Sequence, residues 1–422
     1  MIRLYSLILY VLLPWLLVRL LWRGLRNPAY WRRWGERFGY QFPDASDVYW
    51  VHAVSVGEVR AAVPLINRLL ERYPGCRVLV TTMTPTGSDQ VGQILADRVV
   101  HSYVPYDYPG AVTRFLDHCR PRLVVIMETE LWPNLFHACH ARSIPLLVAN
   151  VRLSEKSARG YERFSRLSRS TLEQVGLFGV QSEVDAQRLR RIGAPLMTVR
   201  VTGNIKFELQ LTASLFEVGE ALRRDWGASR NVLLAASTRD GEEEQILKAL
   251  PDIKKRFADL LLVLVPRHPE RFSVVGQLCR KAGYKVVLRS DFKSQALDES
   301  AEILIGDTMG ELLLFYAAAD VAFVGGSLVN TGGHNILEAC AVGTPVVFGM
   351  SMFNFSEVSQ MVIDRSAGMQ VKDTGELSTA VIRYLEDPSR RFDAGEAGKK
   401  LIEENKGALG RTLALVDELI DT

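Results

Sequence analysis

The sequence lacks the short motifs that mark several large enzyme families. It contains no G-x-x-x-x-G-K-[ST], no G-x-G-x-x-G after its first apolar run and no G-x-S-x-G. The chain therefore lacks the usual signatures of P-loop enzymes, dinucleotide-dependent enzymes and α/β-hydrolases, and these classes are disfavoured. A D-x-D pair of carboxylates, which would chelate a metal and a diphosphate together, is missing as well.

Cysteine is scarce, and its pattern argues against a disulfide framework. The absence of any C-x-x-C favours a reducing compartment. His137 and His140, in HACH, stand three apart on a predicted helix, but no third ligand group accompanies them. We therefore interpret them as helix-surface histidines and expect no metal site. The cysteines are five in number and scattered: Cys76, Cys119, Cys139, Cys279 and Cys340.

The bulk composition is that of a folded protein with more than one domain. The chain has 422 residues, of which 48% are hydrophobic and 23% charged, and this length suggests two or three domains. The net charge of +3 is unevenly distributed. Residues 1–42 carry seven arginines and one acid, so the rest of the chain is slightly acidic. This asymmetry points to an anionic surface at one end and argues against nucleic-acid binding.

The N-terminal segment has the character of a membrane anchor. Leu4–Val18 is uncharged and almost wholly apolar, but shorter than the roughly 20 residues of a comfortable span. No small-residue cleavage site follows it, so we do not expect a removed signal peptide. Arginines then alternate with Trp22, Tyr30, Trp31 and Trp34, as at a headgroup boundary. Residues 1–26 are interpreted as a short span or an in-plane helix, in preference to a buried core helix, with the body in the cytoplasm.

The rest of the chain alternates short β-rich runs with amphipathic helical patterns. Most runs, such as VYWVHAV and RLVVIME, have apolar residues on both parities, as strands covered on both faces do. This pattern predicts an α/β fold with two doubly wound domains. We place them at residues 27–203 and 204–389, followed by a helical segment, 390–422, across the domain joint. The expected ligand site is the cleft between the domains.

Acidic residues stand at two predicted strand exits in the first domain. Ser55 and Glu58 have S-x-x-E spacing, so on spacing alone a capping box is favoured over a general base. Glu128 directly ends an apolar run, and Glu130 follows it. The helix dipole accounts for one acid there but less well for Glu128. Whether the two exits form one site or two separate caps stays open at this point.

The second domain offers phosphate-binding chemistry at three strand exits. Arg267 and His268 follow one strand, and GDTMGE places Met309-Gly310-Glu311 at another. The stretch Gly325–Gly349 crosses two glycine pairs and opens a helix that carries Glu338. Glycines admit a ligand close to the backbone, and a helix start favours an anion. The alternative is a set of tight loops with helix-start acids.

Seven long motifs occur in order along the chain and carry a family resemblance. The chain resembles the 3-deoxy-D-manno-octulosonic acid (Kdo) transferases of lipopolysaccharide assembly, essentially from end to end. One departure is visible: the family's usual GGHNPLE reads GGHNILE, with Ile336 in place of proline. We expect a modest change in nucleotide affinity from it. The motifs are HAVSVGE, TTMTPTGS, METELWPN, VTGNIKF, VPRHPERF, GDTMGEL and FVGGSLVNTGGHNILE.

The resemblance implies a GT-B glycosyltransferase with two Rossmann-like domains facing across a cleft. It implies transfer of Kdo from CMP-Kdo to a lipid A precursor, lipid IVA, at the cytoplasmic face of the bacterial inner membrane. Glu58 would be the general base, and Glu128 and Lys206 would stabilise the transition state. By analogy with other GT-B enzymes, no metal or other cofactor is needed. The implied CMP-sugar-binding residues are Pro266, Arg267, Met309, Gly310, Glu311, Asn335, Ile336, Leu337, Glu338 and Ala339.

Two other functions are compatible with the residues. One is a transferase of the same architecture for a different sugar, such as a heptose or N-acetylglucosamine. The other is a membrane-tethered module that binds the sugar nucleotide without turnover, which leaves the acids Glu58 and Glu128 unexplained. A solvated linker lysine is the ordinary interpretation of Lys206, and only the motif match favours a catalytic role.

Overall fold

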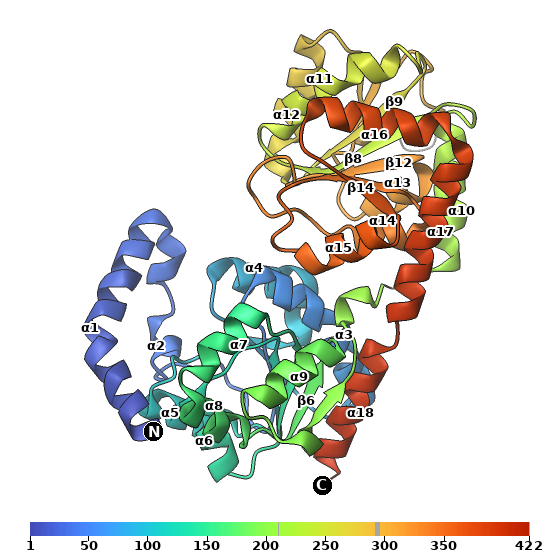
Figure 1. Ribbon diagram of the computed structural model, residues 1–422. Coiled ribbons are helices and arrows are strands. Elements are labelled where there is room, and N and C mark those ends of the chain that lie inside the picture. Colours follow the sequence, from blue (N-terminus) through green and yellow to red (C-terminus); the bar gives the residue numbers. More distant parts are fainter. Residues whose placement is uncertain (210, 292–295, 422) are drawn as a thin grey trace. The chain divides into compact units, whose positions relative to one another are not determined.

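The computed structural model describes residues 1–209, 211–291 and 296–421 (Figure 1). The chain forms two compact units, one of Met1–Glu208 with Asn405–Thr422 and one of Leu209–Glu404. The change of unit comes slightly later than the expected start at residue 204. The expected C-terminal segment, 390–422, is divided between the units, and it contains two helices rather than one. Gly407, with φ +87°, separates these helices.

The first unit is built on a parallel sheet with the strand order β3-β2-β1-β4-β5-β6-β7. β1, β2, β4, β5 and β6 are fully buried runs, as the apolar residues on both parities predict. β3 and β7 lie at the two edges and were not among the predicted strands. The bounds are β1(Tyr49–His52), β2(Val78–Thr82), β3(Val100–Tyr103), β4(Leu123–Met127), β5(Leu146–Val151), β6(Leu177–Val180) and β7(Val199–Val201).

Helices cover both faces of this sheet, and each face has its own apolar core. One core centres on Trp50, Phe115 and Phe178, and the other includes Leu65 and Val416, the latter from the C-terminal helix. The helices of the unit's body are α3(Val56–Arg72), α4(Pro85–Leu95), α5(Pro109–Cys119), α6(Pro133–Ala141), α7(Glu155–Glu162), α8(Ser165–Leu172), α9(Glu183–Arg191) and α18(Ala408–Ile420), with the 3₁₀ turns η2(Ala96–Arg98), η3(Leu196–Thr198) and η4(Ile205–Phe207).

The first unit begins with a long helix, α1(Ile2–Arg26), which extends beyond the uncharged stretch Leu4–Val18. It is long and apolar enough to cross a membrane: its Ile2–Leu25 segment reaches a mean hydropathy of 2.0, and almost none of it is buried. The chain then turns back through η1(Pro28–Trp31) and α2(Trp34–Arg37) to the body of the unit (Figure 1).

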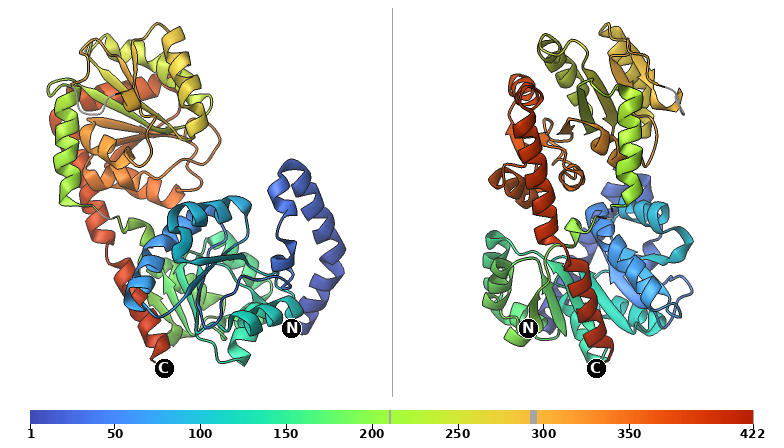
Figure 2. Two further views of the ribbon diagram at one scale, coloured as in Figure 1. Left: turned by 180° about the vertical axis from the view of Figure 1, so that it is seen from behind. Right: turned by 90° about the vertical axis from the view of Figure 1, so that its right-hand side faces the viewer.

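The second unit is also a parallel sheet with helices on both faces (Figure 2). Its strand order is β10-β11-β9-β8-β12-β13-β14, so β11 lies between β10 and β9. The strands are β8(Val232–Thr238), β9(Leu261–Pro266), β10(Val286–Leu288), β11(Ile303–Ile305), β12(Val321–Val324), β13(Val346–Gly349) and β14(Gly368–Val371). The helices are α10(Ala213–Trp226), α11(Glu242–Lys254), α12(Phe272–Lys281), α13(Leu312–Ala318), α14(Leu337–Val342), α15(Ser356–Asp364), α16(Thr374–Glu386) and α17(Pro388–Asn405), with the 3₁₀ turns η5(Pro269–Arg271) and η6(Arg289–Asp291).

Candidate active site

The two acidic strand exits of the first unit lie side by side at the switch point of its sheet, where the order in which strands are added changes direction. β1 and β4 are paired neighbours, but the chain leaves them toward opposite edges of the sheet. Open α/β sheets bind ligands at such a switch point, beyond the carboxyl ends of the strands. Glu58, at the start of α3, follows β1, and Glu128 directly follows β4. The sequence left open whether these exits form one site, and the sheet order brings them together.

Glu58 is the partner of the Ser55 helix cap, and its carboxyl group has a raised pKa. Ser55 is the N-cap of α3 and accepts the Glu58 N–H at 3.5 Å, while its hydroxyl donates to Glu58 Oε1 at 2.9 Å. Glu58 Oε2 accepts the Val54 N–H at 2.8 Å. Burial, and then the negative charge of Glu128, raise the pKa of Glu58 to about 7. At neutral pH this group exchanges a proton readily, as a general base must.

Lys206 is not a solvated linker residue, because it forms an ion pair with Glu128. Its Nζ lies 2.9 Å from Glu128 Oε1, and both side chains are about 70% covered. The Asn204 side chain accepts the Lys206 N–H, and Asn150 Oδ1 accepts the Ile205 N–H, so the η4 turn is fixed to the sheet. Glu128 itself has a left-handed backbone, φ +59°, which is uncommon for a non-glycine residue and typical of functional sites.

Glu130 contributes a further carboxyl group near this pair. It accepts a hydrogen bond from Trp132 Nε1 at 3.1 Å. Burial raises its pKa, and the Glu128 charge adds to the effect. The site at the switch point therefore holds three carboxyl groups and one lysine. Burial is the main cause of the raised pKa of Glu58, and the excess negative charge of the site adds to it.

In the second unit, the predicted nucleotide-binding residues follow β9, β11 and β12, which with β8 are consecutive in the sheet. Pro266 ends β9, and the Arg267 N–H donates to the Thr238 carbonyl at the end of β8. After β11, Met309 is 72% exposed and Gly310 has φ +85°. The Glu311 carboxylate is held by Arg289 at 2.8 Å and by the Thr308 hydroxyl.

The turn after β12 offers backbone and two polar side chains. Asn335 Oδ1 accepts the Leu337 N–H at 3.1 Å, and Asn335 Nδ2 donates to Glu338 Oε1 at 3.3 Å. The side chains of Ile336, Leu337 and Ala339 are buried in the core. Asn335 and Glu338, which are half-buried, are therefore the residues of this turn best placed to contact a ligand. Ile336 lies at the N-cap of α14 rather than at its first helical position.

Glu242 organises the glycine-rich loop after β12, and sequence reasoning missed it. Its fully buried carboxylate accepts the N–H groups of Gly326, Ser327 and Leu328 at 2.6, 2.9 and 2.9 Å, and that of Arg239 at 2.9 Å. The glycines of this loop were expected to bring backbone close to a ligand, but three of the loop's N–H groups bind this carboxylate. The only sequence signal was the acidic run that opens α11.

Arg239 is a second residue that the sequence did not single out. It follows β8, and its guanidinium lies 2.6 Å from His268 Nε2 and 3.2 Å from His334 Nε2. It thereby links the VPRHPERF motif to the GGHNILE motif. Burial, followed by the charges of Arg239 and Arg267, lowers the pKa of His268. Arg239 and Arg267 place positive charge at this edge of the sheet, which suits a phosphate group.

Among the described residues, no group of three His, Cys, Asp or Glu side chains is arranged to hold a metal ion. His137, one of the HACH histidines, instead has its Nδ1 3.3 Å from Gln174 Nε2.

Comparison with known proteins decides the family. Residues 32–209 match the family described as 3-deoxy-D-manno-octulosonic-acid transferase (kdotransferase), and residues 241–401 match glycosyl transferases group 1. The chain is 38% identical to the Kdo transferase of Haemophilus influenzae, over 99% of this chain and 98% of that protein. The chain belongs to the Kdo transferase family. A Bordetella pertussis member is 36% identical over 87% of this chain and 86% of its own length.

Solved structures with low sequence identity support the fold of this Kdo transferase. A glycosyltransferase from Rickettsia africae is 14% identical with a TM-score of 0.55, covering 89% of this chain and 99% of that one. The UDP-GlcNAc 2-epimerase of Neisseria meningitidis is 15% identical with a TM-score of 0.54, covering 85% of this chain and 98% of that one. These likenesses confirm the predicted GT-B architecture of two Rossmann-like units. The protein is a glycosyltransferase.

Proposed function

We propose that this Kdo transferase moves Kdo from CMP-Kdo to a lipid A precursor, lipid IVA, with inversion at the anomeric carbon and without a metal ion. The reaction takes place at the cytoplasmic face of the bacterial inner membrane. The observation that carries the proposal is the position of Glu58 at the switch point of the first unit, beside Glu128 and its partner Lys206, where burial raises the pKa of Glu58 to about 7. A base with such a pKa is half ionised at neutral pH and accepts a proton from a bound hydroxyl.

The chemistry is a single displacement. The carboxylate of Glu58 takes the proton of the acceptor hydroxyl, whose oxygen forms a bond to the anomeric carbon of Kdo. The bond from that carbon to the CMP phosphate oxygen breaks, and CMP leaves with the electron pair. Lys206 and Glu128, paired at 2.9 Å, stabilise the charge that develops in the transition state. Attack opposite the leaving group inverts the anomeric centre.

The second unit holds the donor in this proposal. Arg267 carries the charge that offsets the CMP phosphate. Pro266, Met309-Gly310-Glu311 and the turn from Asn335 to Ala339 surround the nucleotide. The Asn335 and Glu338 side chains offer hydrogen-bonding groups to sugar hydroxyls. A cationic edge built on Arg239 and Arg267 supports this assignment, and the arginines replace a metal ion in neutralising the phosphate.

A donor panel tests the proposed substrate directly. The purified protein is incubated with lipid IVA in detergent and with one sugar nucleotide at a time: CMP-Kdo generated in situ, an activated heptose or UDP-N-acetylglucosamine. We expect a mass gain of Kdo units with the first donor only. Transfer of another sugar would replace the donor assignment, and CMP binding without any transfer would favour the sensor alternative.

A further inference from the structure

The first turns of α1 are docked onto the body of the first unit by partly buried polar contacts. The Tyr5 hydroxyl donates to Asp107 Oδ2 at 3.0 Å, and the Ser6 hydroxyl donates to Asn134 Oδ1 at 2.8 Å. The Tyr108 hydroxyl donates to the Leu9 carbonyl at 3.1 Å. Asp107 and Asn134 are 6 and 5% exposed.

The acceptor for Tyr5 belongs to the core of the unit. Asp107 also accepts the N–H groups of Asn134 and Leu135 at the start of α6, at 3.0 and 2.8 Å. Pulling α1 away would remove one partner from a buried carboxyl group, which is costly. The amino-terminal end of α1 is therefore fixed beside α5 and α6.

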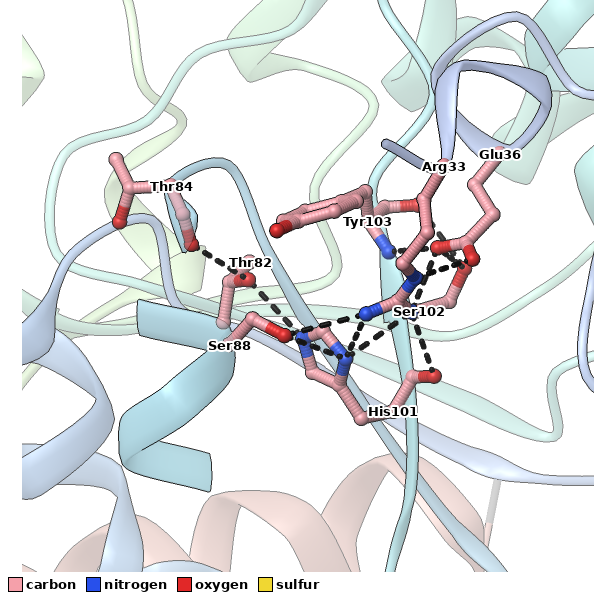
Figure 3. A network of polar contacts seen from close by, with 8 residues as sticks. All are labelled: Arg33, Glu36, Thr82, Thr84, Ser88, His101, Ser102 and Tyr103. Atoms are coloured by element: carbon pink, nitrogen blue, oxygen red, sulfur yellow. Dashed lines mark hydrogen bonds and ion pairs between the residues drawn. The ribbon is translucent and has the colours of Figure 1, made fainter. Parts of the chain in front are cut away.

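The segment that follows α1 is fixed to the same unit. Figure 3 shows the network around Arg33 and Glu36, which joins them to β3. The Glu36 carboxylate accepts the Tyr103 N–H at 2.7 Å and the Ser102 hydroxyl at 3.1 Å, while Arg33 pairs with Glu36 at 2.6 Å. Arg33 also donates to the His101 carbonyl. The amino-terminal end of α1 and the segment that follows the helix are thus held by the same body.

One side of α1 contacts the rest of the unit near the two ends of the helix. Leu20 is buried, and Gly24 packs against the Trp31 ring of the returning segment, whose Nε1 donates to the Leu21 carbonyl. Tyr5, Ser6 and Leu9 lie toward that covered side. The opposite face carries an apolar stripe at alternating spacings of four and three, which follows one side of a helix. Its members are 49–71% exposed: Leu4, Ile8, Val11, Trp15, Val18, Trp22 and Leu25.

Cations flank this stripe at both ends of α1. Arg3 is exposed in the first turn, Arg19 lies over the Trp15 ring at 5.4 Å, and Arg23 lies over the Tyr30 ring at 5.6 Å. Arginine with tryptophan and tyrosine is the composition of a helix at the level of lipid headgroups. A bilayer with anionic headgroups therefore matches both the apolar stripe and its charged borders.

We propose that α1 lies flat in one leaflet of an anionic bilayer, stripe inward, and does not cross the membrane. A span would carry Arg3 and the N-terminal amine to the far side and break the contacts of Tyr5, Ser6 and Leu9. A re-entrant insertion of α1 would drive Arg19 and Arg23 into the hydrocarbon. The inference rests on the proposed function, which places the protein at a membrane. It adds how α1 is oriented in that membrane.

Thiol labelling of the full-length protein tests the topology. Arg3→Cys and Arg68→Cys variants, each with Cys76→Ser, are treated with a membrane-impermeant maleimide in inside-out and right-side-out inner-membrane vesicles. Arg68, exposed on α3, reports the side of the body. We expect both cysteines to label only in the same vesicle type. Labelling of Arg3→Cys in the opposite type would overturn the proposal. A cysteine tag ahead of Met1 gives the same readout if Arg3→Cys fails to fold.

Vesicle flotation tests the stripe with a matched control. Val11→Glu/Val18→Glu places two charges on the stripe, and Val184→Glu/Val274→Glu places two on other exposed valines. With phosphatidylglycerol-containing vesicles, we expect the stripe variant to bind at least tenfold more weakly and the control to bind like wild type. Equal binding of both variants would overturn the proposal. Neither experiment uses donor or acceptor, so a failed sugar transfer and a wrong topology are distinguished.

Discussion

Lys206 Nζ lies 2.9 Å from Glu128 Oε1, although the two residues are 78 positions apart in the chain. The pair joins the η4 turn to the end of β4, next to Glu58. Because Glu128 raises the pKa of Glu58, the partner of Glu128 controls how strong that effect is. The ion pair thus connects the two carboxylates and the lysine into one electrostatic unit.

Variants of this pair are expected to move the pH profile in opposite directions. Glu128→Gln removes a negative charge near Glu58, so the pKa of Glu58 should fall. The rise of kcat/KM with pH should therefore begin at a lower pH than in wild type. Lys206→Met leaves Glu128 uncompensated, so the pKa of Glu58 should rise and the profile should shift to higher pH. Wild type should gain activity as the pH rises through about 7. The measurement is kcat/KM against pH, and shifts of the same sign in both variants would contradict the account.

The raised pKa of Glu58 also predicts a pH-dependent stability. The folded-state pKa of about 7 is above the ordinary value of 4.5, so the stabilisation is complete below 4.5 and is lost as the pH rises through 7. Glu58→Gln lacks this titration. Relative to wild type, the variant should therefore gain about 2–3 kcal/mol in unfolding free energy between pH 5 and pH 8. Denaturant unfolding of both proteins at the two pH values measures it; a constant difference would show that the pKa is not raised.

The capping role of Ser55 can be separated from the base role of Glu58. Ser55→Ala removes the N-cap acceptor and one hydrogen bond to Glu58 Oε1. We expect a loss of about 1 kcal/mol in stability with transfer reduced but retained. Activity as low as that of Glu58→Gln would mean that Ser55 itself takes part in the reaction.

Glu242 should matter for both stability and donor binding. Glu242→Gln directs an amide –NH₂ at backbone N–H donors, so one or more of them lose their acceptor. We expect a loss of about 2–4 kcal/mol and a higher KM for CMP-Kdo. Glu244→Gln, at the exposed neighbouring position on α11, is the matched control and should stay within about 0.5 kcal/mol of wild type. Equal effects of the two substitutions would exclude the organising role of Glu242.

Arg267 should account for phosphate binding without a metal. Arg267→Ala is expected to raise the KM for CMP-Kdo about 10–100-fold, as the loss of a charged hydrogen bond does, while Arg280→Ala on the exposed side of α12 should not. Wild-type transfer should proceed unchanged in EDTA. Loss of activity on chelation, restored by a divalent cation, would contradict the metal-independent mechanism.

Much of the fold could be predicted because its central strands are apolar on both faces. Two edge strands were missed for a physical reason. β3 contains His101 and Ser102, which bond to Arg33, Ser88 and Glu36 instead of packing in an apolar core. The N-terminal segment interpreted as an anchor, residues 1–26, coincides with α1(Ile2–Arg26), which is longer than the uncharged run Leu4–Val18 because arginine does not break a helix.

In the site, features that depend on residues close in sequence could be predicted, and features that depend on residues far apart in sequence could not. The N-cap role of Ser55 is local, so the spacing predicted it, but the Glu58 carboxylate accepts the Val54 N–H rather than the Ser55 N–H of a complete capping box. The raised pKa of Glu58 depends on burial and then on Glu128, and the ion pair of Lys206 also depends on Glu128, so only the folded sheet shows them. Glu242 was missed because its contacts with Gly326, Ser327 and Leu328 join positions 84–86 residues apart.

The most direct test is transfer by wild type and Glu58→Gln side by side, with CMP-Kdo generated in situ, lipid IVA in detergent, and products resolved by mass spectrometry. CMP binding and thermal unfolding are measured on the same preparations. We expect wild type to add Kdo, and Glu58→Gln to bind CMP normally but transfer about 10²–10⁴-fold more slowly. Transfer at the wild-type rate by a folded Glu58→Gln variant would contradict the assignment of Glu58 as the base.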